Sequence, residues 1–277
     1  MIHRRGLAFA ASVLALTWML AISAFGSMSV APLSLQLDLP PGEGGSGSFL
    51  VRNTGSEAID VAVTLHDWWR TPEGNLQVLP TGTVERSCAD WIVYSTELVT
   101  LAPGEEHEIT MDVVIPEDVT GDHWAMLLVE ERPRPAEQAQ VEEGLTDTTR
   151  VIVAYAVKIL QRDPLNEAAG AAITNIAVLD SQPLRLEMTF VNDGNAHITT
   201  SGTVEVRDIY GETVQSFEID PFPSLPGEER ILAVDAPETL EALPAGTYYA
   251  VVQLDFGGDY LIQGGRLLEV SEEALED

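Results

Sequence analysis

The residues that could carry chemistry are few and scattered. Beyond the N-terminal segment the histidines stand apart, without the H-E-x-x-H spacing that places two metal ligands on one helical face: His66, His107, His123 and His197. The single cysteine, Cys88, has no visible activating partner, so we expect a buried, inert thiol. No nucleotide-binding or serine-hydrolase motif is present. The sequence therefore predicts no enzymatic activity, no cofactor and no metal.

Two short segments, one polar and one aromatic, are candidates for a ligand-binding site. Residues 192–195, Asn-Asp-Gly-Asn, could supply oxygen ligands to calcium, but they lack the spacing of a twelve-residue calcium loop, and a tight turn is the better interpretation. Trp68, Trp69 and Arg70 could form a carbohydrate platform. Since adjacent strand residues face opposite ways, one tryptophan is expected in the core and the other at a surface. A carbohydrate site would therefore use Trp69 with acidic neighbours.

Residues 149–162, TRVIVAYAVKILQR, form the longest uninterrupted β pattern of the chain. Strand side chains alternate between two faces. We assign the bulky apolar set to a core: Val151, Val153, Tyr155, Val157 and Ile159. The smaller, mixed set is expected on a partly covered face: Ile152, Ala154, Ala156, Lys158 and Leu160. If this is an edge strand, another chain could add itself to the sheet there.

Composition limits the classes of function. The chain has 277 residues, enough for two domains that each bury a core, and its formal net charge is −30. Lys158 is its only lysine. Such an acidic surface repels phosphate backbones and anionic lipid headgroups, so we expect no nucleic-acid partner. A saline habitat or arginine-biased codon usage would fit the shortage of lysine equally well.

The N-terminus has the pattern of a targeting segment. Arg4 and Arg5 form a basic head, residues 7–24 are almost wholly apolar, and small residues allow a cleavage before Ser27. Residues 1–26 are thus predicted to be a signal peptide or a retained anchor. In both cases we expect the rest of the chain in the periplasm or at the cell surface.

Short alternating strands separated by turns predict an all-β protein. In the first half the strands are expected near residues 33–39, 49–53, 59–65, 91–94, 109–113 and 124–130, with a Gly/Pro-rich turn at 40–47. A polar loop at 132–148 precedes the central strand. In the second half they are expected near 173–179, 184–191, 203–206, 248–254 and 261–270. Helix signals are nearly absent; residues 137–143 and 237–242 could hold at most a short turn.

The two halves share turn motifs in the same order. The pattern Phe49 to Asn53, then Gly55, resembles Phe190 to Asn192, then Gly194, and Pro-Gly-Glu-Glu occurs at both 103–106 and 226–229. The offsets differ, which indicates a divergent duplication. We predict a first immunoglobulin-like sandwich at 28–163, a linker at 164–172, a second sandwich at 173–271 and an acidic tail at 272–277.

A family resemblance joins these features. The segments SLQLDLPPGE…FLVRNTG, WIVYSTELVTLAPGEEHEITMDVVIP and VAYAVKILQRDP, with the long loop, resemble periplasmic pilus (fimbrial) chaperones and related immunoglobulin-like bacterial surface proteins. The resemblance implies two tandem β-sandwiches, export and no enzymatic activity. It also implies that the strand after the long loop lends apolar residues to an incomplete pilus subunit, while a basic residue anchors the subunit's C-terminal carboxylate.

Carried over by this resemblance, the partner-binding residues are Ile152, Ala154, Ala156, Lys158 and Arg162, with Lys158 as the candidate anchor. The chaperones carry a second anchor, an arginine on the first strand, and residues 33–39 contain none. The sequence thus predicts binding of a protein partner by strand addition, in pilus biogenesis or surface assembly. A structural or adhesion module of the cell surface and a carbohydrate-binding module are the alternatives.

Overall fold

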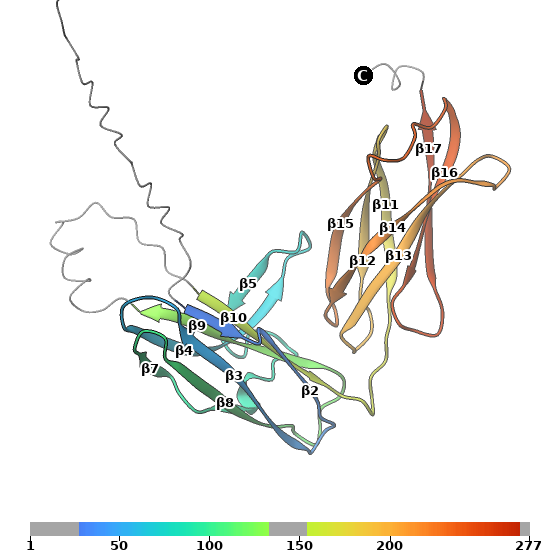
Figure 1. Cartoon of the computed structure of the whole chain (residues 1–277). Helices are drawn as coiled ribbons and strands as arrows, with labels where there is room; N and C mark the ends of the chain where they lie inside the picture. The colour runs from blue at the N-terminus through green and yellow to red at the C-terminus, as the bar shows by residue number, and fades with distance from the viewer. Residues whose placement is uncertain (1–27, 133–153, 272–277) are drawn as a thin grey trace, which may run out of the picture.

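A computed structural model describes residues 28–132 and 154–271 of the chain (Figure 1). Those residues form strands and turns, and the one helical segment among them is a three-residue 3-10 turn at Ala89–Trp91. No helix in this part of the chain has the length and apolarity needed to cross a bilayer. Four sheets stack in pairs around two separate cores, which confirms the predicted all-β fold of two immunoglobulin-like sandwiches.

The first sandwich is built from the strands before the linker. One sheet has the order β1 (Met28–Ala31), β3 (Gly44–Asn53), β8 (Glu106–Val114) and β6 (Ile92–Tyr94). The other has the order β2 (Ser34–Asp38), β10 (Ala154–Arg162), β9 (His123–Arg132) and β4 (Ile59–Arg70). Two short strands pair with separate ends of β4: β5 (Leu76–Leu79) and β7 (Leu98–Leu101).

The second sandwich contains the remaining strands. Its smaller sheet has the order β11 (Ala172–Ser181), β12 (Leu184–Val191) and β15 (Glu229–Asp235). Its larger sheet has the order β14 (Thr213–Ser224), β13 (Ile198–Arg207), β16 (Gly246–Asp255) and β17 (Ile262–Val270). Sequence analysis missed β14, which contains Pro221 and Pro223. A proline cannot donate to a neighbouring strand, and β14 tolerates two because it lies at a sheet edge.

The first sandwich departs from the predicted strands at its N-terminal end. The single strand expected at residues 33–39 is β2, at 34–38, and a separate strand, β1, precedes it in the opposite sheet. The glycine-rich turn expected at 40–47 is shorter, because β3 begins at Gly44. A Cβ on Gly45 would lie 2.8 Å from a methyl group of Leu39, so the glycines allow close packing here in addition to turning the chain.

The assignment of alternate residues of the central strand to the core is confirmed from residue 154 onward. Val157 and Ile159 are fully buried in the first core, and Tyr155 packs against it. On the opposite face Ala154 is exposed and Ala156 partly covered, as expected for a half-covered face. Residues 149–153, with Val151, Ile152 and Val153, lie outside the described part of the chain.

The motifs that recur in the two halves make the same hydrogen bonds. Asn53 and Asn192 are both fully buried, and the side-chain oxygen of each accepts from the glycine N–H two residues later, at 2.9 and 3.1 Å. Glu105 and Glu228 each accept, at 2.7 Å, from the backbone N–H three residues earlier. The shared motifs therefore build equivalent turns.

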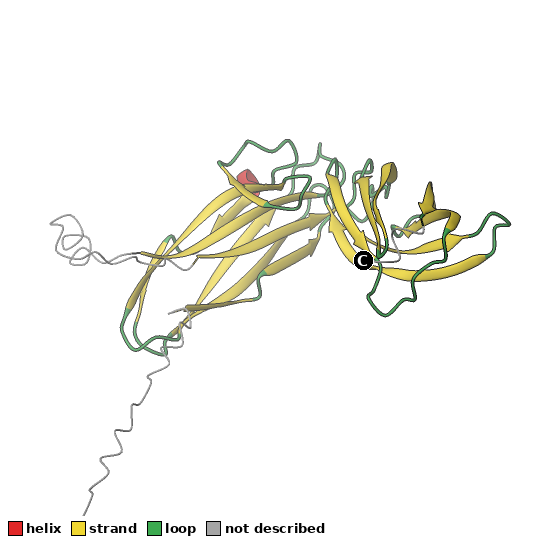
Figure 2. Cartoon of the chain, turned by 90° about the horizontal axis from the view of Figure 1, so that it is seen from above, coloured by secondary structure: helices red, strands yellow, loops and turns green. Residues whose placement is uncertain are grey.

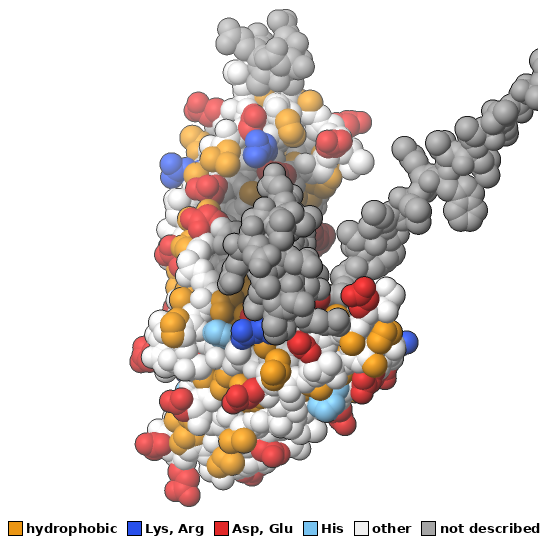
Figure 3. Space-filling model, turned by 90° about the vertical axis from the view of Figure 1, so that its left-hand side faces the viewer, with side chains coloured by type: hydrophobic (Ala, Val, Ile, Leu, Met, Phe, Trp, Pro, Cys, Tyr) orange, Lys and Arg blue, Asp and Glu red, His pale blue; other side chains and the backbone are white. Residues whose placement is uncertain are grey.

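The two sandwiches meet through loops and strand ends (Figure 2). The N–H of Asp122 donates to the carbonyl of Asn195 at 2.8 Å, and the N–H of Ile231 donates to the carbonyl of Pro72 at 2.7 Å. Pro72 lies in the β4–β5 hairpin, which extends toward β15 of the second sandwich (Figure 1). On the face shown in Figure 3, acidic side chains are spread over both sandwiches and basic ones are few.

Candidate functional site

The central strand is only partly at a sheet edge. β10 pairs antiparallel with β9 over residues 154–161, and in parallel with β2 over residues 158–162. The prediction of an edge strand is therefore wrong for residues 158–162, which have hydrogen-bonded neighbours on both sides. It holds for residues 154–157, which have no strand beside them opposite β9 among the described residues. The edge is short because β2 begins only at Ser34.

Hydrogen-bond directions show which groups this edge presents. The N–H of Lys158 donates to the carbonyl of Leu33 at 3.0 Å, on the β2 side. Backbone groups of a strand alternate in direction, so the N–H and C=O groups of Ala154 and Ala156 point to the same side. At these two residues, no strand in the described part of the chain pairs with that side. The site thus offers two donors and two acceptors to an incoming strand.

Lys158 lies where the open edge meets the paired half of β10. Its Nζ is 4.9 Å from the centre of the Trp68 ring, and the guanidinium carbon of Arg70 is 5.6 Å from the same ring. Burial lowers the pKa of Lys158, Arg70 lowers it further, and Glu228 raises it. No carboxylate forms an ion pair with Lys158 among the described residues. The ammonium is thus available to a further anion.

Arg162 is the last residue of β10, and its charge already has partners within the chain. Its guanidinium lies 2.6 Å from the carboxylate of Glu167, in the linker, and 4.0 Å from that of Asp38. It also belongs to the half of β10 that β2 covers. Its charge is thus paired with Glu167, and it lies outside the open edge formed by residues 154–157.

A buried ion pair between the sandwiches was not foreseen. Glu228 is fully buried, and its carboxylate accepts from Arg70 Nη2 at 3.1 Å, with Arg70 Nε at 2.8 Å from the second oxygen. Arg230 Nη1 lies 3.8 Å from that oxygen. The Pro-Gly-Glu-Glu pattern predicted a turn at Glu228, but a partner 158 residues away leaves no local signal.

A second set of contacts between the sandwiches involves Asp122 and His197. The Asp122 carboxylate accepts from the backbone N–H of His197 at 2.6 Å, and burial raises the pKa of this carboxyl group. Burial lowers the pKa of the His197 imidazole to about 4, helped by three nearby cations, Arg70, Arg162 and Lys158. His197 is therefore a neutral part of the interface, and among residues 28–132 and 154–271 it belongs to no group of metal-ligating side chains.

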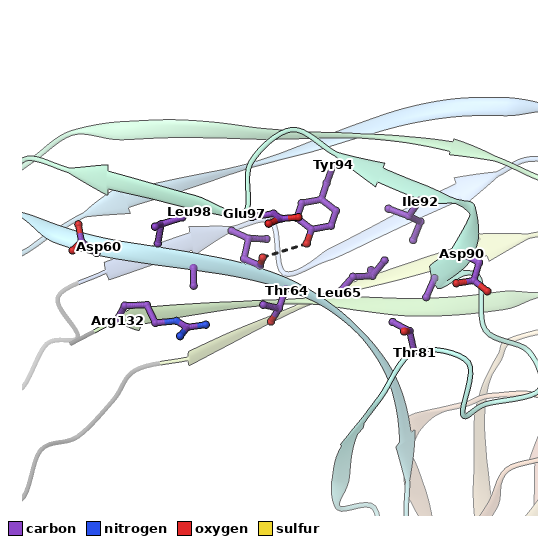
Figure 4. A pocket seen from close by; sticks show the side chains of 13 residues that line it. Asp60, Thr64, Leu65, Thr81, Asp90, Ile92, Tyr94, Glu97, Leu98 and Arg132 are labelled. Carbon is purple, nitrogen blue, oxygen red and sulfur yellow. Dashed lines mark hydrogen bonds between the residues drawn. The ribbon is translucent and has the colours of Figure 1, made fainter. Parts of the chain in front are cut away.

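A cavity of about 970 Å³ opens beside β4 in the gap between β5 and β7 (Figure 4). Its lining includes the carboxylates of Asp60, Asp90 and Glu97, and the Tyr94 hydroxyl donates to the Val63 carbonyl at 3.3 Å. Burial raises the pKa of Tyr94, and the charge of Glu97 adds to the rise. The described residues that line it include no histidine, cysteine or serine, and its hydroxyl groups are those of Thr64, Thr81 and Tyr94. The Thr64 hydroxyl lies 2.9 Å from Nε2 of His66.

The remaining candidates have structural roles. Cys88 is fully buried, and burial raises the pKa of its thiol, as expected for an inert cysteine. Residues 192–195 form the turn described above, and no group of three metal-ligating side chains occurs among the described residues. Trp68 is buried and Trp69 partly buried, as the alternation predicted. Trp68, however, belongs to a small cluster that includes Leu225 of the second sandwich.

Known proteins match this chain in structure and at low sequence identity. No protein-family model matches the sequence, and no curated protein matches it as a relative. Similar solved structures include a chaperone–tip adhesin complex of CFA/I fimbriae biogenesis, with 13% identity over 88% of this chain and 99% of that chain and a TM-score of 0.49. The periplasmic chaperone SfaE matches with 9% identity over 88% of this chain and 100% of that one, at a TM-score of 0.36.

A third match is the CsuC–CsuE complex of a chaperone with a tip adhesion subunit, from the archaic chaperone-usher Csu pili of Acinetobacter baumannii, with 11% identity over 87% of this chain and 98% of that chain and a TM-score of 0.44. The resemblance to periplasmic pilus chaperones expected from the sequence is thus present as a structural match over most of the chain.

Proposed function

We propose that this chain is an exported, non-enzymatic protein that captures a protein partner by β-strand addition, in the manner of a pilus chaperone. One observation carries the proposal. β10 is paired on both sides at residues 158–162 but on one side only at residues 154–157. The paired half fixes the strand within the sandwich, and the unpaired half extends the same strand with its backbone groups open.

The open half would supply affinity through the backbone. Each backbone hydrogen bond contributes about 0.5–1.5 kcal/mol net, and the open N–H and C=O groups belong to Ala154 and Ala156. Both side chains are small, so a partner strand can approach without a clash. The partner's own alternate side chains would then decide specificity.

Lys158 would anchor a carboxylate of the partner, such as its C-terminus. The first strand lacks the arginine that the chaperones use as a second anchor, and the neighbouring cation here is Arg70 of β4, which faces the same Trp68 ring as Lys158. Arg70 shares its charge with Glu228, so Lys158 carries the larger part of the attraction. The partner class that fits is a pilus-like subunit or a surface protein with an incomplete sheet, met in the periplasm or at the cell surface.

Substituting the open edge tests this proposal. Ala156→Pro removes an N–H that points to the open side, so it should break no hydrogen bond of the folded chain. Ala154→Asp places a charge on an exposed alanine of the same edge. Both should abolish cross-linking of the full chain to its partner in envelope extracts, while thermal unfolding stays close to that of the parent.

Ala233→Asp is the matched control, because Ala233 is an exposed alanine on β15, an edge strand of the second sandwich. It should leave capture unchanged. Equal capture by the parent and by Ala156→Pro would overturn strand addition at this edge.

A further inference from the structure

A second cavity, of about 530 Å³, lies between the two sandwiches. The first sandwich contributes Trp69, Trp124 and residues 83–86, and the second contributes residues 193–194 and 226–227, which belong to the two recurrent turns. The volume lies in the range of small-molecule sites, and the contacts between the sandwiches preform it. It is separate from the open edge of β10, because no β10 residue lines it.

The cavity has a flat aromatic wall. Trp69 stacks on Trp124 with ring centres 5.7 Å apart and planes 28° apart. Trp124 is buried, and its indole N–H donates to the Trp68 carbonyl at 3.0 Å. This hydrogen bond fixes the Trp124 ring, and the Trp69 ring stacks on it. The partly buried Trp69 therefore presents a rigid apolar surface to the cavity.

The rim combines acceptors with a donor. Glu85 and Asp193 are exposed, come from different sandwiches, and have no hydrogen bond or ion pair with another described residue. Arg86 uses its Nη1 to donate to the carbonyls of Thr120 and Asp122, at 3.2 and 3.3 Å, which holds the guanidinium at the rim. The rim thus offers two carboxylate acceptors and one oriented cation above the aromatic wall.

This combination selects among ligand classes. An anion would meet Glu85 and Asp193, a cation would meet Arg86, and a hydrocarbon would strip water from all three charges without replacing its hydrogen bonds. A neutral polyhydroxylated ring avoids each problem. Its C–H face can lie on Trp69, and its hydroxyl groups can donate to the carboxylates and accept from Arg86.

We propose that this cavity binds a neutral carbohydrate, with Trp69 as the stacking residue and with Glu85, Asp193 and Arg86 as hydrogen-bond partners. The site requires both sandwiches in their observed arrangement, because Asp193 and residues 226–227 come from the second. It is independent of partner capture by β10 and does not rest on it.

Titration of the full chain with sugars, followed by tryptophan fluorescence and calorimetry, tests the site. The probes are cellobiose, maltose, lactose and diacetylchitobiose, with a neutral-glycan array for wider coverage. Saturable binding of at least one neutral sugar is expected. Trp69→Ala should weaken it by about tenfold or more, and Trp69→Phe by less, because an aromatic face remains.

A second variant keeps the test valid if substitution of Trp69 unfolds the chain. Glu85→Gln combined with Asp193→Asn changes only exposed side chains, and it should weaken binding by about tenfold while the fold stays intact. Glu57→Gln, an exposed glutamate remote from the cavity lining, should bind as the parent does. Absence of saturable binding to every neutral glycan, or binding that survives both variants unchanged, would overturn the proposal.

Discussion

His197 shows how a single side chain depends on the contact between the sandwiches. The sequence placed it among scattered histidines without a role. In the structure its ring is desolvated at the interface and faces three cations, and its pKa is lowered from 6.5 to about 4. In the unfolded chain the ring regains its ordinary affinity for protons, so between these two pH values the unfolded state binds more protons than the folded one.

Stability should therefore fall as the pH is lowered from about 6.5 to about 4, by roughly 3 kcal/mol from this residue. His197→Gln removes the titrating group and keeps the backbone N–H that donates to Asp122. Its urea midpoint should decline less than that of the parent as the pH is lowered over this range. Any advantage in urea midpoint that the parent has over the variant at pH 7.5 should therefore be smaller at pH 5. Parallel pH profiles would contradict this account.

At the scale of elements, the recurrent turns hold each sandwich at one end. The Asn192 side chain donates to the carbonyls of Ala196 and Ser224, at 3.0 and 3.2 Å. Asn53 does the same toward Glu57 and Leu101, at 2.7 and 3.0 Å. Each buried amide thus joins three backbone segments, including the glycine N–H that it accepts from.

Asn192→Ala should destabilise the second sandwich by about 3 kcal/mol, because it leaves two buried carbonyls and the part-buried N–H of Gly194 without partners. Asn53→Ala should affect the first sandwich in the same way. Hydrogen exchange measured segment by segment would assign each loss to its own sandwich. Asn75→Ala, at an exposed position in the β4–β5 hairpin, is the control. A loss of under about 1 kcal/mol at Asn192 would show that these bonds are easily replaced.

For the whole molecule, the ion pair of Arg70 and Glu228 links the two sandwiches. Removing one partner of a buried pair leaves an uncompensated charge, which costs about 3–5 kcal/mol. Glu228→Gln leaves Arg70 and Arg230 facing each other without the carboxylate between them. We expect lower stability and a wider distribution of angles between the sandwiches, measured by calorimetry and small-angle scattering.

Glu105→Gln is the matched control, because Glu105 occupies the same turn position in the first sandwich and is exposed. It should change neither stability nor scattering measurably. Arg70→Met with Glu228→Leu should recover part of the stability lost by Glu228→Gln, since it also removes the Arg70 charge and leaves Arg230 as the one cation of this cluster without the carboxylate. Unchanged scattering in Glu228→Gln would mean that the other contacts alone fix the arrangement.

The sequence by itself determined the local features of this protein. Alternation predicted that Tyr155, Val157 and Ile159 face a core, and the recurring Asn-x-Gly and Pro-Gly-Glu-Glu motifs predicted turns, because strand faces and turn geometry depend on neighbouring residues. Glycine-rich and proline-containing strands, β3 and β14, were misjudged or missed, because their residues are tolerated only through particular neighbours.

Only the tertiary structure decided what each of these elements contacts. It divided β10 into a paired and an open half, set Arg162 beside Asp38 of β2, brought Arg70 to Glu228, and placed Trp69 and Asp193 in the lining of one cavity. Each of these contacts joins residues far apart in the chain or sets the point where one strand begins beside another. Local side-chain preferences do not encode such distances, since they follow from how whole sheets pack.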